Sequence, residues 1–203
     1  MLKRLCILAT TLCGLCISHT SLAEGNAEAG ATKAVVCQAC HGANGNSVNP
    51  QWPSLAGLGA DYISTQLANF KSGKRVNAIM AANVIALTPQ DMDDLGAYFG
   101  GLPNTGLEAD PSFWKAGEAL YRGGDTTRGI PACMACHGPT GYGNEPAKFP
   151  ALRGQHSEYV VAQLTAYASG ERWPGPNGIM GMIAKRLTPD DMRNVASYVQ
   201  GLH

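Results

Sequence analysis

Two copies of one pentapeptide have the residue types and spacing to attach a haem covalently. Residues 37–41 and 133–137 both read C-x-x-C-H, the attachment signature of a c-type haem. Two thiols three residues apart can each form a thioether with one porphyrin, and the histidine that follows can supply an axial nitrogen. One match is compatible with chance or with a redox dithiol, but two matches within longer repeated segments favour two haem c groups. The expected covalent attachment points are Cys37, Cys40, Cys133 and Cys136, with His41 and His137 as axial iron ligands.

One methionine in each copy is a candidate for the opposite axial position. Met80 and Met180 each follow an isoleucine and precede a matched Leu-Thr-Pro by seven residues. A thioether is a soft, neutral ligand that favours ferrous iron, as in His/Met cytochromes. Both methionines lie in segments rich in Gly, Asn and Pro, which predict loops. Met92 and Met192 instead recur on apolar helix stripes and are expected to fill the core. We predict that Met80 and Met180 are iron ligands.

Several neighbouring residues have two interpretations each. A carbonyl near Pro53 or Pro150 can accept the Nδ1–H of the haem-motif histidine and fix its ring, or these prolines only shape a loop. Arg75 and Arg172 can pair with haem propionates, or they are solvated surface side chains. His156 is expected to be a surface histidine rather than a ligand.

The chain carries an internal duplication that is larger than the haem motif. Residues 52–57 match residues 149–154, and the offset between the copies grows from 96 to 100 through small insertions in the second copy. The helical residues Tyr62 and Gln66 match Tyr159 and Gln163. We therefore expect two small domains, at residues 24–102 and 112–203, joined by a linker at residues 103–111 that is rich in Pro and Gly.

Helical patterns recur in both copies, and no segment shows a sustained strand pattern. Thr88 and Thr188 are good N-caps, each followed by proline at the first helical position and by acidic residues, so each copy is expected to end in a helix. Apolar residues at i, i+4 and i+7 predict a middle helix around residues 63–70 and again around residues 160–167. Further helices are expected near residues 27–36 and 112–122. The predicted fold class is all-α, with two tandem domains that each wrap around one haem.

Residues 1–23 have the pattern of a cleaved signal peptide. Lys3 and Arg4 precede an apolar stretch at residues 5–17, and Ser21-Leu22-Ala23 offers small residues at the cleavage position. The apolar stretch is shorter than the roughly 20 residues that span a bilayer. We expect a mature chain from Glu24, a periplasmic location and no transmembrane helix after cleavage. Cleavage would also leave only the four haem-motif cysteines, so no structural disulfide is expected.

The composition is that of a soluble globular protein. Apolar residues make up 45% of the 203 residues and charged residues 15%, with 15 basic and 15 acidic side chains. This balance argues against a nucleic-acid partner recognised by bulk charge.

The chain resembles the cytochrome c4 family, periplasmic dihaem cytochromes built from two class I cytochrome c domains. The resemblance covers nearly all of residues 25–203. It departs at Leu58, where the second copy keeps the family-like Gln155. The segments that carry the resemblance are residues 37–45, 53–57, 62–75, 121–124, 129–133 and 153–156.

The resemblance implies an electron carrier of a bacterial respiratory chain, with haems that face each other across the domain interface. Such a protein relays single electrons from a periplasmic or membrane donor to a terminal oxidase, and peripheral membrane association is compatible with that role. One alternative is an electron-accepting haem subunit of a dehydrogenase complex. A dihaem enzyme such as a peroxidase would need an open axial site, whereas both copies offer a methionine. We therefore expect a carrier and not an enzyme.

Overall fold

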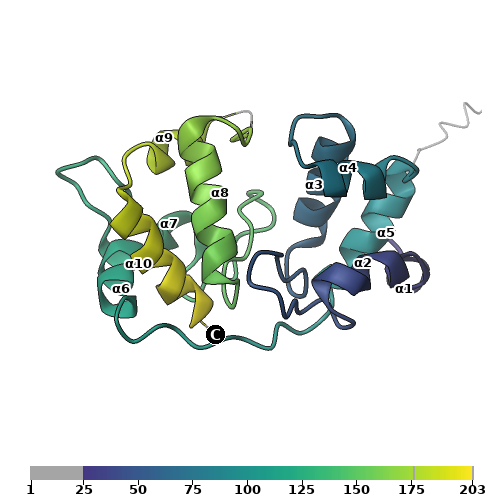
Figure 1. The fold of residues 1–203 in the computed structure, drawn as a ribbon, viewed down its shortest axis with the longest axis horizontal. Coiled ribbons are helices and arrows are strands. Elements are labelled where there is room, and N and C mark those ends of the chain that lie inside the picture. Colours follow the sequence, from purple (N-terminus) through teal and green to yellow (C-terminus); the bar gives the residue numbers. More distant parts are fainter. Residues whose placement is uncertain (1–24, 176, 203) are drawn as a thin grey trace, which may run out of the picture.

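The computed structural model describes residues 25–175 and 177–202, and these residues form two helical lobes joined by an extended segment (Figure 1). The expected signal peptide and the mature N-terminus at Glu24 lie outside the described residues. Pairing between extended segments is limited, within the described residues, to isolated bridges such as that between Arg75 and Arg172. The predicted all-α fold class is confirmed.

The first lobe is built around its last helix. Its helices are α1 (Ala27–Lys33), α2 (Val35–His41), α3 (Ala60–Lys71), α4 (Ala78–Val84) and α5 (Pro89–Gly100). Helix α5 packs against both α1 and α3, and α4 packs against α3. Leu95 and Phe99 of α5 are almost fully buried beside Ala34 and Ile63. The apolar stripe of α5 therefore forms the centre of this core.

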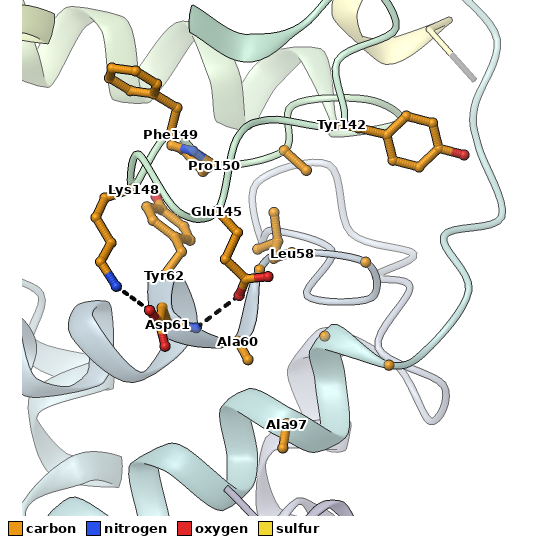
Figure 2. Close-up of a pocket in the computed structure, with 15 residues that line it drawn as sticks. Leu58, Ala60, Asp61, Tyr62, Ala97, Tyr142, Glu145, Lys148, Phe149 and Pro150 are labelled. Carbon is orange, nitrogen blue, oxygen red and sulfur yellow. Dashed lines mark hydrogen bonds and ion pairs between the residues drawn. The ribbon is translucent and has the colours of Figure 1, made fainter. Parts of the chain in front are cut away.

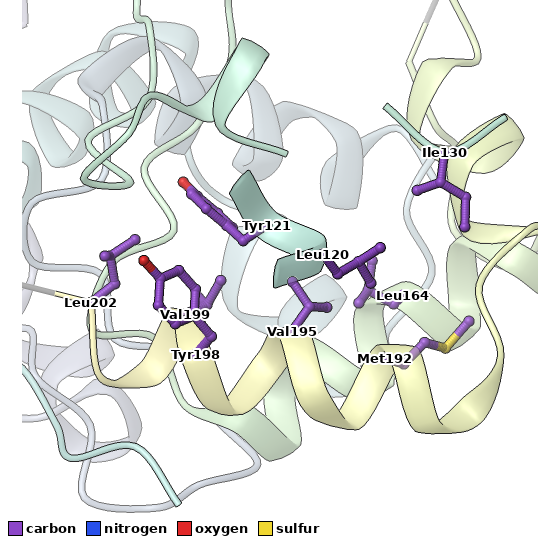
Figure 3. Close-up of a cluster of buried hydrophobic side chains, with 9 residues drawn as sticks. All are labelled: Leu120, Tyr121, Ile130, Leu164, Met192, Val195, Tyr198, Val199 and Leu202. Atoms are coloured by element: carbon purple, nitrogen blue, oxygen red, sulfur yellow. The ribbon is translucent and has the colours of Figure 1, made fainter. Parts of the chain in front are cut away.

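The second lobe repeats this arrangement. Its helices are α6 (Trp114–Gly123), α7 (Met134–His137), α8 (Ser157–Ser169), α9 (Ile179–Ala184) and α10 (Pro189–Gln200). Helix α10 packs against α6 and α8, and α9 packs against α8. Figure 3 shows Val195 and Val199 of α10 pointing towards Leu120 and Tyr121 of α6. The buried Tyr121 hydroxyl donates to the carbonyl oxygen of Gly138 at 2.7 Å, so the core also supports the residue that follows the second haem motif.

The predicted ends of α5 and α10 are confirmed by their caps. Thr88 accepts from the Asp91 N–H and Thr188 from the Asp191 N–H, each aspartate bonds back to its cap, and proline occupies the first turn. Each cap satisfies backbone donors that helix geometry leaves unpaired.

Three local expectations were wrong: the extent of the first helix, the loop around Met80 and the loop around Met180. The helix expected at residues 27–36 breaks at the buried Ala34, and the first haem motif lies on the separate helix α2. Met80 and Met180 lie in the short helices α4 and α9 rather than in loops. These helices have seven and six residues, too short to show a clear apolar period. Asn77 caps α4 by accepting from the Met80 N–H. An asparagine at this position was a signal for a helix start, but the segment's content of Gly, Asn and Pro favoured a loop.

The segment between α5 and α6 is held by hydrogen bonds to both lobes. Asn46 of the first lobe donates to the Pro103 carbonyl oxygen at 3.0 Å. Asp110 N–H donates to the Ser197 hydroxyl of α10 at 2.9 Å. These bonds hold the connection against each lobe. In the described part of the chain no helix is both long and apolar enough to cross a membrane.

A glycine permits close helix crossing in each lobe. A Cβ added at Gly30 of α1 would lie 2.1 Å from the Asp94 carbonyl oxygen of α5, and one at Gly117 of α6 would lie 2.0 Å from the Asn194 carbonyl oxygen of α10. Such distances are far inside van der Waals contact. The first helix of each lobe therefore packs on the last through a position that has no room for a side chain.

The first prediction concerns this crossing. Gly117→Ala should lower the free energy of unfolding by about 1–3 kcal/mol, because α6 must move away from α10. Gly123→Ala on the same helix is the matched control: nothing lies within 4 Å of its added Cβ. Alanine there should be neutral or stabilise by up to about 1 kcal/mol. Denaturant unfolding followed by circular dichroism measures both, and equal stability of the two variants would contradict the crossing argument.

Candidate haem sites

Each haem-motif histidine ends a short helix and is held by a proline carbonyl. His41 and His137 are 8% and 7% exposed. Their Nδ1 atoms lie 2.8 Å from the carbonyl oxygens of Pro53 and Pro150. Because a carbonyl can only accept, the proton is on Nδ1 and the Nε2 lone pair is left for a metal. Of the two interpretations of Pro53 and Pro150, the structure supports the one in which the proline carbonyl accepts from the histidine, in both lobes.

Burial keeps these two imidazoles neutral. It lowers the pKa of His41 and of His137, and the hydrogen bonds to Pro53 and Pro150 oppose that effect only in part. A neutral imidazole is the form that binds iron. The electrostatics of each lobe therefore suit its histidine to axial ligation.

A cavity of about 240 Å³, lined by residues of both lobes, joins three of the predicted site residues of the first lobe. Cys40 and His41 line it from α2, and Met80 lines it from α4. Trp52 and Pro53 form another part of the wall. Cys37 packs instead against the hydrophobic core of the lobe. The fold therefore brings one thiol, the imidazole and the thioether to one cavity.

In the second lobe two of the predicted site residues pack against the core of that lobe. Cys133 and Met180 both pack against the buried cluster that includes Leu164 and Met192. The ring of Phe149 lies 6.2 Å from that of His137. Cys136 is half-buried on α7, one position before His137. Met182 is 54% exposed, in contrast to the half-buried Met180.

The cysteines do not have the environment of a redox dithiol. Burial raises the pKa of Cys37, and it raises the pKa of Cys133 to about 11. Redox-active C-x-x-C motifs instead depend on a thiol whose pKa is lowered, because the thiolate is the reactive form. The dithiol alternative is therefore disfavoured in both lobes.

Two arginines meet where the lobes face each other. Arg75 donates to Tyr159 and Gln163 of the second lobe, both at 2.8 Å. Arg172 is 6% exposed and donates to the Tyr62 hydroxyl of the first lobe at 2.8 Å. Of the two interpretations of these arginines, the solvated surface side chain is contradicted, because both bond across the interface and Arg172 is buried. The matched tyrosine and glutamine pairs had no expected role, but their recurrence at the same helical positions was the available signal in the sequence.

The arginine pair carries positive charge without a carboxylate partner. None of the ion pairs among the described residues includes Arg75 or Arg172. Burial opposes ionisation of Tyr62, but the charges of Arg172 and Arg75 outweigh it and hold its pKa below the usual value. Buried charges are costly unless they are paired. Both arginines line the cavity that His41 and Met80 share, so an anionic group there would compensate them.

A second set of contacts joins a loop of the first lobe to the start of α8. The Gln155 side chain both accepts from Ser54 N–H and donates to Ser54 O, each at 2.9 Å. The Nε2 of His156 lies 2.8 Å from the Ser47 carbonyl oxygen, to which it donates. His156 is only 6% exposed, so the expectation of a surface histidine was wrong. The one indication in the sequence that His156 has a structural role was its position directly before a helix.

A further cavity of about 230 Å³ lies at the same interface. Figure 2 shows Glu145 and Lys148 of the second lobe reaching Asp61 at the start of α3. Glu145 accepts from the Asp61 N–H at 3.3 Å, and Lys148 forms an ion pair with the Asp61 carboxylate. Leu58, Pro150 and further residues line the cavity between these contacts.

The residues present fit a haem in their donor set and charge. A buried neutral imidazole with Nε2 available, a thioether on the same cavity wall and an adjacent thiol match the ligands of a c-type haem. The two unpaired guanidiniums match the carboxylates that a haem carries. When bound, the haem iron supplies a one-electron couple.

Comparisons with known proteins agree with these features. The sequence profile of the family described as Cytochrome c matches residues 27–102 and 115–203. The chain is 44% identical over 206 residues to the cytochrome c4 of Azotobacter vinelandii, covering 97% of this chain and 98% of that protein. It is 38% identical over 169 residues to the thiosulfate dehydrogenase electron acceptor of Stutzerimonas stutzeri (strain A1501), covering 81% of this chain and 78% of that protein. The crystal structure of reduced recombinant cytochrome c4 from Pseudomonas stutzeri matches with a TM-score of 0.86 at 42% identity, covering 88% of this chain and 100% of that chain.

The second prediction concerns the buried arginine between the lobes. Arg172→Lys keeps the charge but cannot reach Tyr62, Gln163 and Gln66 together, because lysine lacks the planar fork. Loss of charged hydrogen bonds should lower the free energy of unfolding by about 1.5–3 kcal/mol. Arg193→Lys is the control, since the exposed Arg193 forms an ion pair with the exposed Asp190 carboxylate and its guanidinium lies 4.8 Å from the centre of the Phe113 ring, and it should cost less than about 1 kcal/mol. Denaturation of the haem-loaded proteins measures both, and an equal cost in the two variants would refute the structural role.

Proposed function

The chain belongs to the cytochrome c4 family of dihaem electron carriers, and on that premise we propose that it relays single electrons in a bacterial respiratory chain. The proposed donor is a periplasmic or membrane redox protein and the proposed acceptor a terminal oxidase. As a member of this family the protein binds two covalently attached haem c groups and is a carrier rather than an enzyme. A periplasmic location, reached through a signal peptide at residues 1–23, belongs to the same proposal.

The residues that hold the haems are proposed from their chemistry. Cys37 and Cys40 would attach the first haem and Cys133 and Cys136 the second. The axial pairs would be His41 with Met80 and His137 with Met180. The observation that carries the proposal is the buried His41, with Nδ1 committed to Pro53 and with Met80 on the wall of the same cavity. Two filled axial positions suit electron transfer, because no site remains for a substrate on the iron.

The arginine pair is proposed to compensate the haem propionates. Arg75 and Arg172 are positive, close together and without a carboxylate partner among the described residues. Guanidinium groups bind carboxylates through paired hydrogen bonds. Propionates of both haems near this pair would place the haem edges at the lobe interface, where an electron can pass between them. Domains at residues 24–102 and 112–203, with a linker at 103–111, are part of this proposal.

A second candidate partner is a dehydrogenase. It is supported by the 38% identity to a thiosulfate dehydrogenase electron acceptor over 81% of this chain. In that role the protein would be the electron-accepting subunit of the dehydrogenase complex rather than a carrier between respiratory complexes. The two roles differ in the partner that reduces the haems and in whether that partner stays bound.

The third prediction tests the respiratory role. Pre-reduced protein should be reoxidised within seconds by washed membranes that contain a terminal oxidase, and cyanide should block the reaction because it inhibits the oxidase. Absorbance of the reduced haem bands follows the rate, and heat-treated membranes are the control. Slow, cyanide-insensitive oxidation combined with rapid reduction by thiosulfate and a copurifying dehydrogenase would favour the second candidate instead.

The fourth prediction separates two methionines on α9. Met180 matches Met80 by the shared Ile-Met pair, whereas Met182 matches Ala82 and is 54% exposed. Replacing Met180 by alanine should remove the methionine–iron absorption band of one haem and lower one reduction potential, since a thioether stabilises ferrous iron. Met182→Ala is the matched control and should leave both potentials unchanged. A spectroscopic redox titration measures both, and the reverse pattern would assign the ligand to Met182.

A further inference from the structure

The side chain of Gln155 in the second lobe holds a peptide that belongs to the first haem site. Its Oε1 accepts from Ser54 N–H and its Nε2 donates to Ser54 O, each at 2.9 Å. Gln155 and Ser54 are 6% and 3% exposed, so water does not compete strongly for these bonds. Ser54 directly follows Pro53, whose carbonyl oxygen holds His41.

We propose that Gln155 is a positioning residue for the first haem: across the lobe interface it orients and polarises the Pro53–Ser54 peptide and so lowers the reduction potential at His41. The inference rests on the proposed ligation of iron by His41. It concerns only the effect of the second lobe on the hydrogen bond and basicity of His41.

The physical basis is that one peptide group makes both bonds. Pro53 C=O and Ser54 N–H are the two ends of a single amide: the oxygen accepts from His41 Nδ1–H and the N–H donates to Gln155. Donation by the N–H increases the negative charge on the oxygen, because linked hydrogen bonds polarise one another. A more negative oxygen strengthens the His41 bond and makes the imidazole more basic. A more basic ligand stabilises ferric over ferrous iron and lowers the potential.

The same loop is held at a second point by His156. His156 donates through Nε2 to Ser47 O, and Ser47 N–H donates to the Ser54 hydroxyl at 3.2 Å. The Ser47 hydroxyl donates to the Cys40 carbonyl oxygen at 3.3 Å. The start of α8 therefore fixes the loop from Ser47 to Ser54 against the haem motif, and the Gln155 amide is held in register with Ser54.

The second lobe lacks the reciprocal contact. Pro150 O accepts from His137 Nδ1–H in the same way, but no hydrogen bond to the Ala151 N–H is found among residues 25–175 and 177–202. The residue that corresponds to Gln155 is Leu58, which has no polar atom in its side chain. Leu58 and Ala151 line the 230 Å³ cavity, and Figure 2 labels Leu58 among the lining residues. Both copies thus have the histidine–proline hydrogen bond. Within the described residues, only the first copy has a side chain of the other lobe bonded to the N–H of the same peptide.

The fifth prediction uses two substitutions in opposite directions. Gln155→Met keeps the side-chain volume and removes both bonds to Ser54. It should raise the potential of the first haem, with about a three- to tenfold change in its ferrous-to-ferric ratio at fixed potential, tenfold being 59 mV. Leu58→Gln places an amide beside Ala151 and should lower the potential of the second haem. Leu58→Met is the matched control and should change neither potential.

Redox titration of the haem-loaded proteins gives both potentials, and NMR signals of the ligands assign each potential to its haem. In Gln155→Met the His41 Nδ1–H resonance should also shift towards that of a weaker hydrogen bond. A structural role alone would admit water at the interface, favour the charged ferric site and lower the potential instead. A lowered or unchanged first potential in Gln155→Met overturns the inference, as does a second potential in Leu58→Gln equal to that in Leu58→Met.

The wild-type NMR spectrum separates this inference from the proposed function. His41 ring protons with the large shifts caused by bound paramagnetic iron, together with an unaffected potential in Gln155→Met, would reject the role of Gln155 alone. Unshifted His41 protons would reject the ligation on which the inference rests. Since Leu58→Gln leaves the Gln155 contact in place, it tests the polarisation step even if Gln155→Met fails to fold.

Discussion

The hydrogen bond from each buried histidine to a proline carbonyl is the interaction on which the rest of the structure depends. It settles which nitrogen carries the proton, and therefore which one is available to iron. It also ties the last residue of the haem motif to a loop that lies outside the helices. Each lobe then has to hold that loop in place, and the short helices, capped ends and close glycine crossings provide a rigid frame for it.

The first lobe obtains part of that support from its neighbour. Ser47 and Ser54 make their cross-lobe contacts with two successive residues, Gln155 and His156, in a region where both sides are buried. Side-chain hydrogen bonds in such surroundings are strong and costly to leave unmade. The lobes are therefore coupled through the surroundings of His41, the proposed iron ligand, as well as through their facing surfaces. Contacts from the second lobe therefore make the surroundings of the two histidines different, although the two haem motifs have the same spacing.

Much of this was predictable from sequence because it depends on local chemistry. The haem motifs and the capped helices after Thr88 and Thr188 follow from residue type and spacing, and the histidine–proline bonds were one of two interpretations that residue type and spacing allowed. The loops predicted around Met80 and Met180 were wrong, because helices of seven and six residues are too short to show a helical period in the sequence. The expectation for His156 was wrong, and the interpretation of Arg75 and Arg172 stayed open, for a different reason: their surroundings come from the other lobe. Burial by residues about 100 positions away leaves no mark on the local pattern.

The same long-range contacts explain why charge gathers where the lobes meet. Two guanidiniums lie among Tyr62, Tyr159, Gln66 and Gln163, which satisfy their donors but do not neutralise them. Positive charge in a site of low polarity favours the reduced state of a nearby redox group, since reduction adds an electron. Anionic propionates would offset that charge, so the net field at each haem depends on how the lobes dock. With the haems held as proposed, the interface would be part of the redox site, and its geometry would set the potential together with the axial ligands.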